Sequence, residues 1–142
     1  MKTSECKFSK CLYFTSNALA RKVEKLAIES WKPVDLSPSH GYLLMLVLDD
    51  PGIQPGTIAD QLQLTPSTIS RLLEKLEERK LVVRTTEGKT TNVYPSPKAK
   101  QLLPELQACV VRSQAAYQES LGNHDIKDLV KNMNQVSDKL TD

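Results

Sequence analysis

Few residues of this chain of 142 amino acids are suited to catalysis or metal binding. The two histidines, His40 and His124, lie far apart, and the sequence contains no HExxH, GxSxG, P-loop or GxGxxG motif. Cys6 and Cys11 form one close pair of cysteines, but no second pair follows at the spacing of a zinc finger. The residue types therefore predict a protein that is not an enzyme and that holds no metal ion or cofactor.

The side chains best suited to recognise another molecule lie in residues 66–80. On a helical wheel Ile69, Leu72, Leu73 and Leu76 share one apolar face, and the remaining surface carries small hydroxyl groups and cations. In the major groove of DNA, Ser and Thr can reach base edges or phosphates and Arg can bond guanine through two N–H groups. The alternative is an amphipathic helix with a solvated polar face. The candidate DNA contacts here are Thr65, Pro66, Ser67, Thr68, Ser70, Arg71 and Lys75.

Three pairs of Ser or Thr followed by Pro mark the start of helices, at Ser37-Pro38, Thr65-Pro66 and Ser96-Pro97. The hydroxyl can accept a free backbone N–H, and proline suits the first position of a helix. Residues 57–62 form a further short helix, for which Thr57 is a candidate cap.

The pattern changes after residue 80, where 81–86 and 90–94 are rich in Val, Thr and Tyr and flank Glu87-Gly88-Lys89. This arrangement is typical of a β-hairpin. The predicted fold is mainly α with a small β-hairpin wing, a winged helix-turn-helix flanked by N- and C-terminal dimerisation helices. The predicted order is helices over 8–32, 38–48, 57–62 and 66–80, the hairpin, and helices over 96–120 and 126–140.

Residues 36–84 read LSPSHGYLLMLVLDDPGIQPGTIADQLQLTPSTISRLLEKLEERKLVVR, and PSPKAKQLLPEL follows shortly after. This sequence resembles the MarR family, the multiple antibiotic resistance regulators, which are winged-helix transcription factors. The resemblance implies a homodimer that binds palindromic operator DNA, usually as a repressor. It also implies release from the double-stranded DNA by a small-molecule effector or a redox signal.

The resemblance also assigns roles to individual residues. Ser67, Thr68, Ser70 and Arg71 match the part of the family's recognition helix that meets the major groove. The residues that match the helix start touching the DNA backbone and the wing are Ser37, Ser39, His40, Arg84 and Lys89. Three features depart from the family pattern: the wing lacks the Asp-x-Arg motif, the hairpin is shorter, and Lys80 replaces a glycine.

The chain divides into a central unit, residues 36–96, and two helical ends, residues 1–35 and 97–142. The central unit is the predicted DNA-binding domain, and the ends form the predicted dimerisation region because each carries an apolar stripe. The alternative is a monomer that packs its own ends together. The central unit has six cations and seven anions. DNA binding therefore requires that Asp49, Asp50, Glu77 and Glu78 lie away from the face that presents Arg71, Lys75, Arg84 and Lys89.

The residues that could receive a signal are less clearly defined. Cys6 and Cys11 are candidate redox residues because Lys7 and Lys10 could stabilise a thiolate. They could equally be small apolar residues of a dimer interface, whereas Cys109 is expected in the core. The candidate residues of a ligand pocket are Tyr13, Trp31, His40 and Tyr42, all of which could instead serve packing.

The chain has no apolar run long enough to cross a membrane and no signal-peptide pattern, which predicts a cytoplasmic protein without membrane contact. Two functions from different classes fit the sequence. One is a transcriptional regulator that binds DNA as a homodimer, and the other is a winged-helix module that binds proteins and not DNA.

Overall fold

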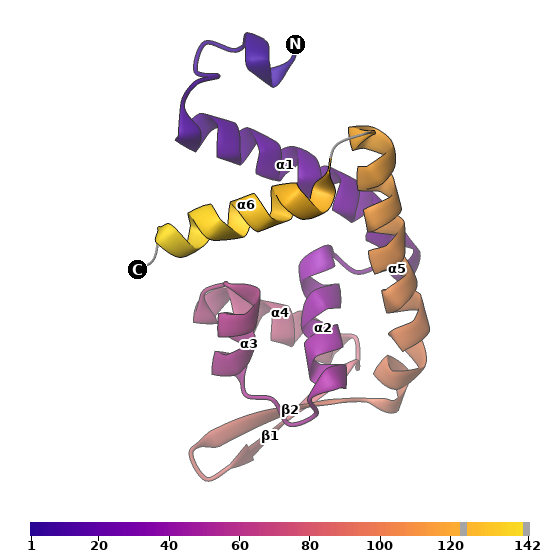
Figure 1. The fold of residues 1–142 in the computed structure, drawn as a ribbon. Helices are drawn as coiled ribbons and strands as arrows, with labels where there is room; N and C mark the ends of the chain where they lie inside the picture. The colour runs from indigo at the N-terminus through magenta and orange to yellow at the C-terminus, as the bar shows by residue number, and fades with distance from the viewer. Residues whose placement is uncertain (123–124, 141–142) are drawn as a thin grey trace.

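The computed structural model describes residues 1–122 and 125–140, so the predicted helix end at Gly122-Asn123 lies partly outside the described residues. The predicted fold class is confirmed: helices and one two-stranded antiparallel hairpin follow each other in the expected order. Figure 1 shows α2, α3, α4 and the hairpin grouped together, while α1, α5 and α6 extend beyond them. The elements are α1 (Leu12–Trp31), α2 (Pro38–Asp49), α3 (Pro55–Leu62), α4 (Pro66–Glu78), β1 (Val82–Glu87), β2 (Thr90–Pro95), α5 (Pro97–Leu121) and α6 (Ile126–Lys139), with 3-10 turns η1 (Thr3–Glu5) and η2 (Lys32–Val34).

All three predicted Ser/Thr-Pro helix starts are confirmed. Ser37, Thr65 and Ser96 each accept a backbone N–H from the residue three positions later, and proline follows each cap. The prediction that Thr57 caps α3 is wrong, because α3 begins at Pro55 and Gln54 is its N-cap residue. Proline is suited to the first helical position since it has no backbone N–H to satisfy there.

Besides the start of α3, two helix boundaries differ from the prediction by more than one residue. Helix α1 begins at Leu12 and not at residue 8, because η1 and further turns occupy the preceding residues. Helix α4 ends at Glu78 and not at Lys80, whose φ of 59° places it in the left-handed region. The backbone N–H of Lys80 bonds the Glu77 carbonyl and that of Leu81 bonds the Leu76 carbonyl, both at 2.9 Å. These two bonds close the helix, although a non-glycine residue there costs about 1 kcal/mol.

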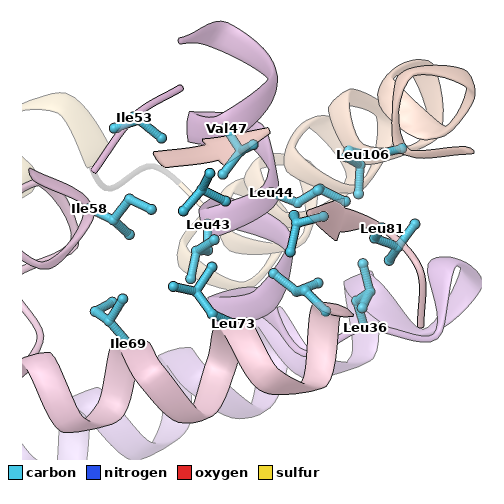
Figure 2. Packing of buried hydrophobic residues seen from close by; sticks show 14 of the residues in the cluster. Leu36, Leu43, Leu44, Val47, Ile53, Ile58, Ile69, Leu73, Leu81 and Leu106 are labelled. Atoms are coloured by element: carbon cyan, nitrogen blue, oxygen red, sulfur yellow. The ribbon is translucent and has the colours of Figure 1, made fainter. Parts of the chain in front are cut away.

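A continuous apolar core joins α4 to the other elements. Ile69, Leu73 and Leu76 of α4 are buried, as the helical spacing predicts, and Leu72 is half-buried beside them. Figure 2 shows α4 side chains directed toward α2, which contributes Leu43, Leu44 and Val47 from the opposite side. Because this edge of α4 is buried along its length, the opposite side of the helix must face outward.

The base of the hairpin is also fixed in the core. Residue Val82 pairs with Pro95 and Glu87 pairs with Thr90 at the two ends of the antiparallel register. Val82 and Val93 are buried, and Ile53 bridges to Val93 from the loop before α3. The hairpin therefore projects from the core at a position set by its first and last residues.

The junction between α1 and α2 depends on close contact between two residues. Trp31 at the end of α1 is completely buried, and its ring centroid lies 5.4 Å from that of Tyr42. Gly41 lies against the same indole, so a Cβ atom at this position would meet Trp31 Cζ3 at 2.1 Å. Arg112 of α5 adds a hydrogen bond of 2.9 Å to the Ser30 carbonyl. Helices α1, α2 and α5 are thus held together at one place.

We expect Gly41→Ala to destabilise the fold by about 1–3 kcal/mol, because the added methyl group must displace the buried indole. Gly56→Ala is the matched control, since a Cβ atom added to Gly56 of α3 would meet nothing within 4 Å. Urea unfolding followed by circular dichroism measures both free energies of unfolding. Equal stability of Gly41→Ala and the parent chain would contradict the described packing.

Candidate nucleic-acid interface

The exposed side of α4 carries a set of polar side chains whose positions are fixed at the N-terminus of the helix. Thr65 Oγ1 lies 3.2 Å from Ser67 Oγ and 2.9 Å from Thr68 Oγ1. Arg71 Nη2 lies 3.4 Å from Thr68 Oγ1, which places the guanidinium over the first turn. Ser67, Ser70 and Arg71 are exposed, whereas Thr68 is half-buried. Thr65 and Thr68 therefore support this end of the helix, and Ser67, Ser70 and Arg71 are exposed on its outer side.

The start of α2 lies beside the second half of α4. Ser37 Oγ and His40 Nδ1 are 2.5 Å apart, and the Ser39 side chain is exposed on the same turn. Burial, followed by the positive charges of Lys75 and Arg79, lowers the pKa of the His40 imidazole. The structure thus brings His40, Ser37 and Lys75 together from two separate segments of the sequence.

Two cations near this surface were not among the sequence candidates. The Arg79 guanidinium donates a hydrogen bond to the Asp35 carbonyl, and Lys98 Nζ lies 3.2 Å from the Arg79 carbonyl. Arg79 could have been found from its spacing, because Arg71, Lys75 and Arg79 follow one another at intervals of four residues. Lys98 is adjacent only through the tertiary fold.

The wing presents its two candidate cations differently. Lys89 is exposed at the tip, next to Gly88 with a φ of 65°. Arg84 forms an ion pair with Glu77 of α4, and about one third of each side chain is exposed. The expectation that Glu77 lies away from Arg84 is therefore wrong, since the turn after α4 brings these two residues together.

The candidate signal residues occupy different parts of the molecule. Cys11 and Tyr13 are exposed at the start of α1, and Cys6 is half-buried with its Sγ 3.6 Å from the Lys2 carbonyl. Trp31 belongs to the core, so it is a packing residue in this structure. Cys109 is buried, as predicted.

Tyr42 lies at the edge of a cavity of about 400 Å³ between α2, the end of α3 and α5. The lining is largely apolar, and Asp49 is the charged side chain in it. Of the candidate ligand residues, Tyr42 lines this cavity, whereas Tyr13, Trp31 and His40 do not. The lining residues are Tyr42, Met45, Leu46, Leu48, Asp49, Leu62, Leu103 and Gln107.

A short helix, a turn, a helix with an exposed polar face and a hairpin wing together define the winged helix-turn-helix class of proteins. Among the described residues, no helix is both long and apolar enough to cross a membrane.

Comparisons with known proteins relate the chain to one family within the winged helix-turn-helix class. Residues 34–90 match the sequence model of the MarR family. CouR, a transcriptional repressor bound to a 23-mer DNA duplex, has a TM-score of 0.80 and 23% identity over 94% of this chain and 99% of that chain. CouR from Rhodococcus jostii RHA1, bound to p-coumaroyl-CoA, has a TM-score of 0.71 and 22% identity over 96% of this chain and 91% of that chain. A comparison with curated proteins finds no significant match.

A MarR-family transcriptional regulator from Rhodococcus sp. RHA1 has a TM-score of 0.71 and 25% identity over 96% of this chain and 94% of that chain. The chain is thus similar to the MarR family over residues 34–90, and it shares the winged-helix fold of solved regulators of that family.

The stability of the protein should depend on pH through His40. Its pKa is lowered in the folded state, so between about pH 6.5 and the folded-state value the unfolded chain binds more protons than the native chain. Stability conferred by neutral His40 is therefore present above about pH 6.5 and is lost as the pH falls below it. We expect the difference in free energy of unfolding between the parent and His40→Gln to shrink from pH 7.5 to pH 5.5.

Urea unfolding at both pH values tests this expectation. Carboxyl groups titrate in both proteins, so their contribution cancels when the two are compared at the same pH. A difference that stays constant or grows on acidification would contradict the placement of His40 beside Lys75 and Arg79.

Proposed function

We propose that this protein is a cytoplasmic regulator that binds palindromic operator DNA as a homodimer, usually to repress transcription. The observation that carries the proposal is the orientation of α4. Its apolar edge is buried through Ile69, Leu73 and Leu76, which leaves Ser67, Ser70 and Arg71 exposed on the other side. A helix held in this way can insert its polar N-terminal half into a major groove about 12 Å wide.

The contacts divide by chemistry. Arg71 is suited to a guanine edge or a phosphate, and the hydroxyls of Ser67 and Ser70 are suited to base edges or phosphates. Thr65 and Pro66 begin the helix, and Thr68 supports Arg71. The residues proposed to contact phosphates around the groove are Ser37, Ser39, His40, Lys75, Arg79, Lys89 and Lys98.

The dimer would be formed by residues 1–35 and 97–142. Apolar side chains are exposed on α1 (Leu12 and Leu19), on α6 (Met133 and Val136) and at the C-cap of α6 (Leu140). Because a helix gains most of its stability from packing an apolar face, these side chains favour a covering partner. These side chains line a largely apolar groove of about 520 Å³ between α1 and α6. A second copy that covers this groove would place two α4 helices about one DNA turn apart.

The cavity beside Tyr42 is the proposed effector site. CouR was solved with p-coumaroyl-CoA, which supports a small-molecule signal for proteins of this fold. The cavity here has an apolar lining with one carboxylate, Asp49, so it favours a neutral or cationic apolar molecule. Since α2, α3 and α5 all border it, a bound molecule could change how the helices of the DNA-binding unit are placed.

Oxidation is the alternative signal. Cys11 is exposed and Cys6 is half-buried at the start of the predicted dimerisation region. Loss of DNA binding after peroxide treatment in the parent protein, but not in Cys6→Ser or Cys11→Ser, would assign the signal to that thiol.

We expect Arg71→Ala to weaken DNA binding by about 100-fold or more, because a bidentate contact discriminates by about 1–3 kcal/mol and the dimer has two copies. Fluorescence anisotropy with a duplex from the region upstream of the gene measures the affinity. Arg21→Ala, which removes an exposed arginine of α1, is the matched control. Unchanged affinity in folded Arg71→Ala would remove Arg71 from the interface.

A salt series on the same duplex separates the proposal from its alternative, a winged-helix module that binds proteins. The alternative is favoured by the excess of anions in residues 36–96 and by exposed Val83 and Tyr94 on the hairpin. DNA binding should weaken steeply as salt rises, because each phosphate contact releases counterions. Absence of salt-dependent binding would favour the protein-binding module.

A charge placed in the apolar groove between α1 and α6 tests the proposed dimer. We expect Met133→Asp to convert a dimer into monomers, because the new carboxylate would be buried against the second copy without a partner. Asn134→Asp adds the same charge to α6 outside the groove lining and should leave the dimer intact. Analytical ultracentrifugation distinguishes the two states. A parent protein that sediments only as the 15.9 kDa chain at micromolar concentration would contradict the proposed dimer.

A further inference from the structure

We propose that Glu77 of the recognition helix masks Arg84 of the wing, so that Arg84 adds no phosphate contact in the parent protein and Glu77 limits DNA affinity. The inference rests on the proposed DNA-binding function. It assigns opposite roles to two wing cations, because Lys89 is exposed at the hairpin tip while Arg84 is paired with a carboxylate.

The direction of the Arg84 side chain follows from its position on the strand. Side chains two residues apart on a strand share a face, so Arg84 lies on the same face as Val82. Val82 is buried in the core, and the residue opposite Arg84 in the register, Val93, is also buried. This face of the hairpin is turned toward the body of the protein, where the C-terminal part of α4 lies.

Glu77 is held at a fixed position to receive the guanidinium. Its backbone carbonyl accepts the N–H of Lys80, and the preceding Leu76 is buried. The closed turn at Lys80 leaves little freedom between α4 and β1. Of the two ion pairs found among residues 1–122 and 125–140, the pair of Glu29 and Lys32 spans one turn, whereas Glu77 and Arg84 join the helix to the wing.

The ion pair between Glu77 and Arg84 hinders the binding of a phosphate by Arg84. A DNA phosphate would have to compete with the Glu77 carboxylate for the same guanidinium N–H groups. If Arg84 turned to the phosphate, the freed carboxylate would remain close to the negatively charged backbone of DNA. The ion pair therefore opposes the use of Arg84 by the wing and leaves that contact to Lys89.

The test measures how DNA affinity depends on salt for four variants of the full chain. Glu77→Gln keeps the shape of the side chain and removes the charge that holds Arg84. We expect its affinity to rise several-fold and the slope of log K against log salt to steepen by about 0.9 for each phosphate gained. Arg84→Ala should leave the parent slope unchanged, and the double variant should show no steepening.

Glu78→Gln is the matched control, because it removes the same charge from the adjacent, exposed residue, which has no ion pair among the described residues. Its slope should equal that of the parent. Equal steepening in Glu77→Gln and Glu78→Gln would overturn the proposal, because the effect would then be a general loss of negative charge. A shallower slope in Arg84→Ala would also overturn it, because Arg84 would already contact DNA.

Failure of the inference differs from failure of the proposed function. A parent protein without salt-dependent DNA binding contradicts the proposed function, whereas a binding parent with a shallower Arg84→Ala slope contradicts only the masking. Circular dichroism checks the fold of each variant. If Glu77→Gln does not fold, the Arg84→Ala slope still decides, since masking requires that it match the parent.

Discussion

The arrangement of the proposed DNA-binding unit depends on the burial of one edge of α4. Ile69, Leu73 and Leu76 pack into a core to which α2 contributes Leu43, Leu44 and Val47. Burying a Leu or Ile side chain contributes about 1.5–3 kcal/mol, so rotating α4 to expose this edge would cost several kcal/mol. The outward direction of Arg71 is therefore set by apolar packing on the opposite side of the helix, without any charge interaction.

A second contact relates this unit to the ends of the chain. Trp31 ends α1, is completely buried and occupies the space left by the missing side chain of Gly41 in α2. Since α2 packs on α4 and α5 bonds to α1 through Arg112, a change in how α1 and α5 meet a second copy would be felt at α2. In the proposed dimer, the close packing of this junction would transmit the geometry of the dimer to the two α4 helices.

Local signals explain which features could be predicted from the sequence. The caps Ser37, Thr65 and Ser96 and the apolar spacing of α4 involve neighbours in the chain, so the sequence alone is enough to place the helix-turn-helix and its wing. The burial of Trp31 and the pairing of Arg84 with Glu77 depend on tertiary contacts, which periodicity does not report. Arg79 could have been predicted from the sequence, because it follows Arg71 and Lys75 at the same interval of four residues.

The distribution of charge suggests how a unit with more anions than cations could still recognise DNA. Arg71 and Lys75 of α4 and Arg79 at its C-cap follow one another at intervals of four residues, but Glu74, Glu77 and Glu78 belong to the same helix. The net charge of the unit then adds little long-range attraction to DNA, so affinity must come from individual phosphate contacts and from well-placed hydrogen bonds in the groove. On the proposed function, each subunit supplies half of these contacts, so full affinity requires that both α4 helices engage together. A small change in the separation of the two helices would then be enough to release the operator. A strongly basic surface would bind DNA even when one helix is misplaced, so it would respond less to such a change.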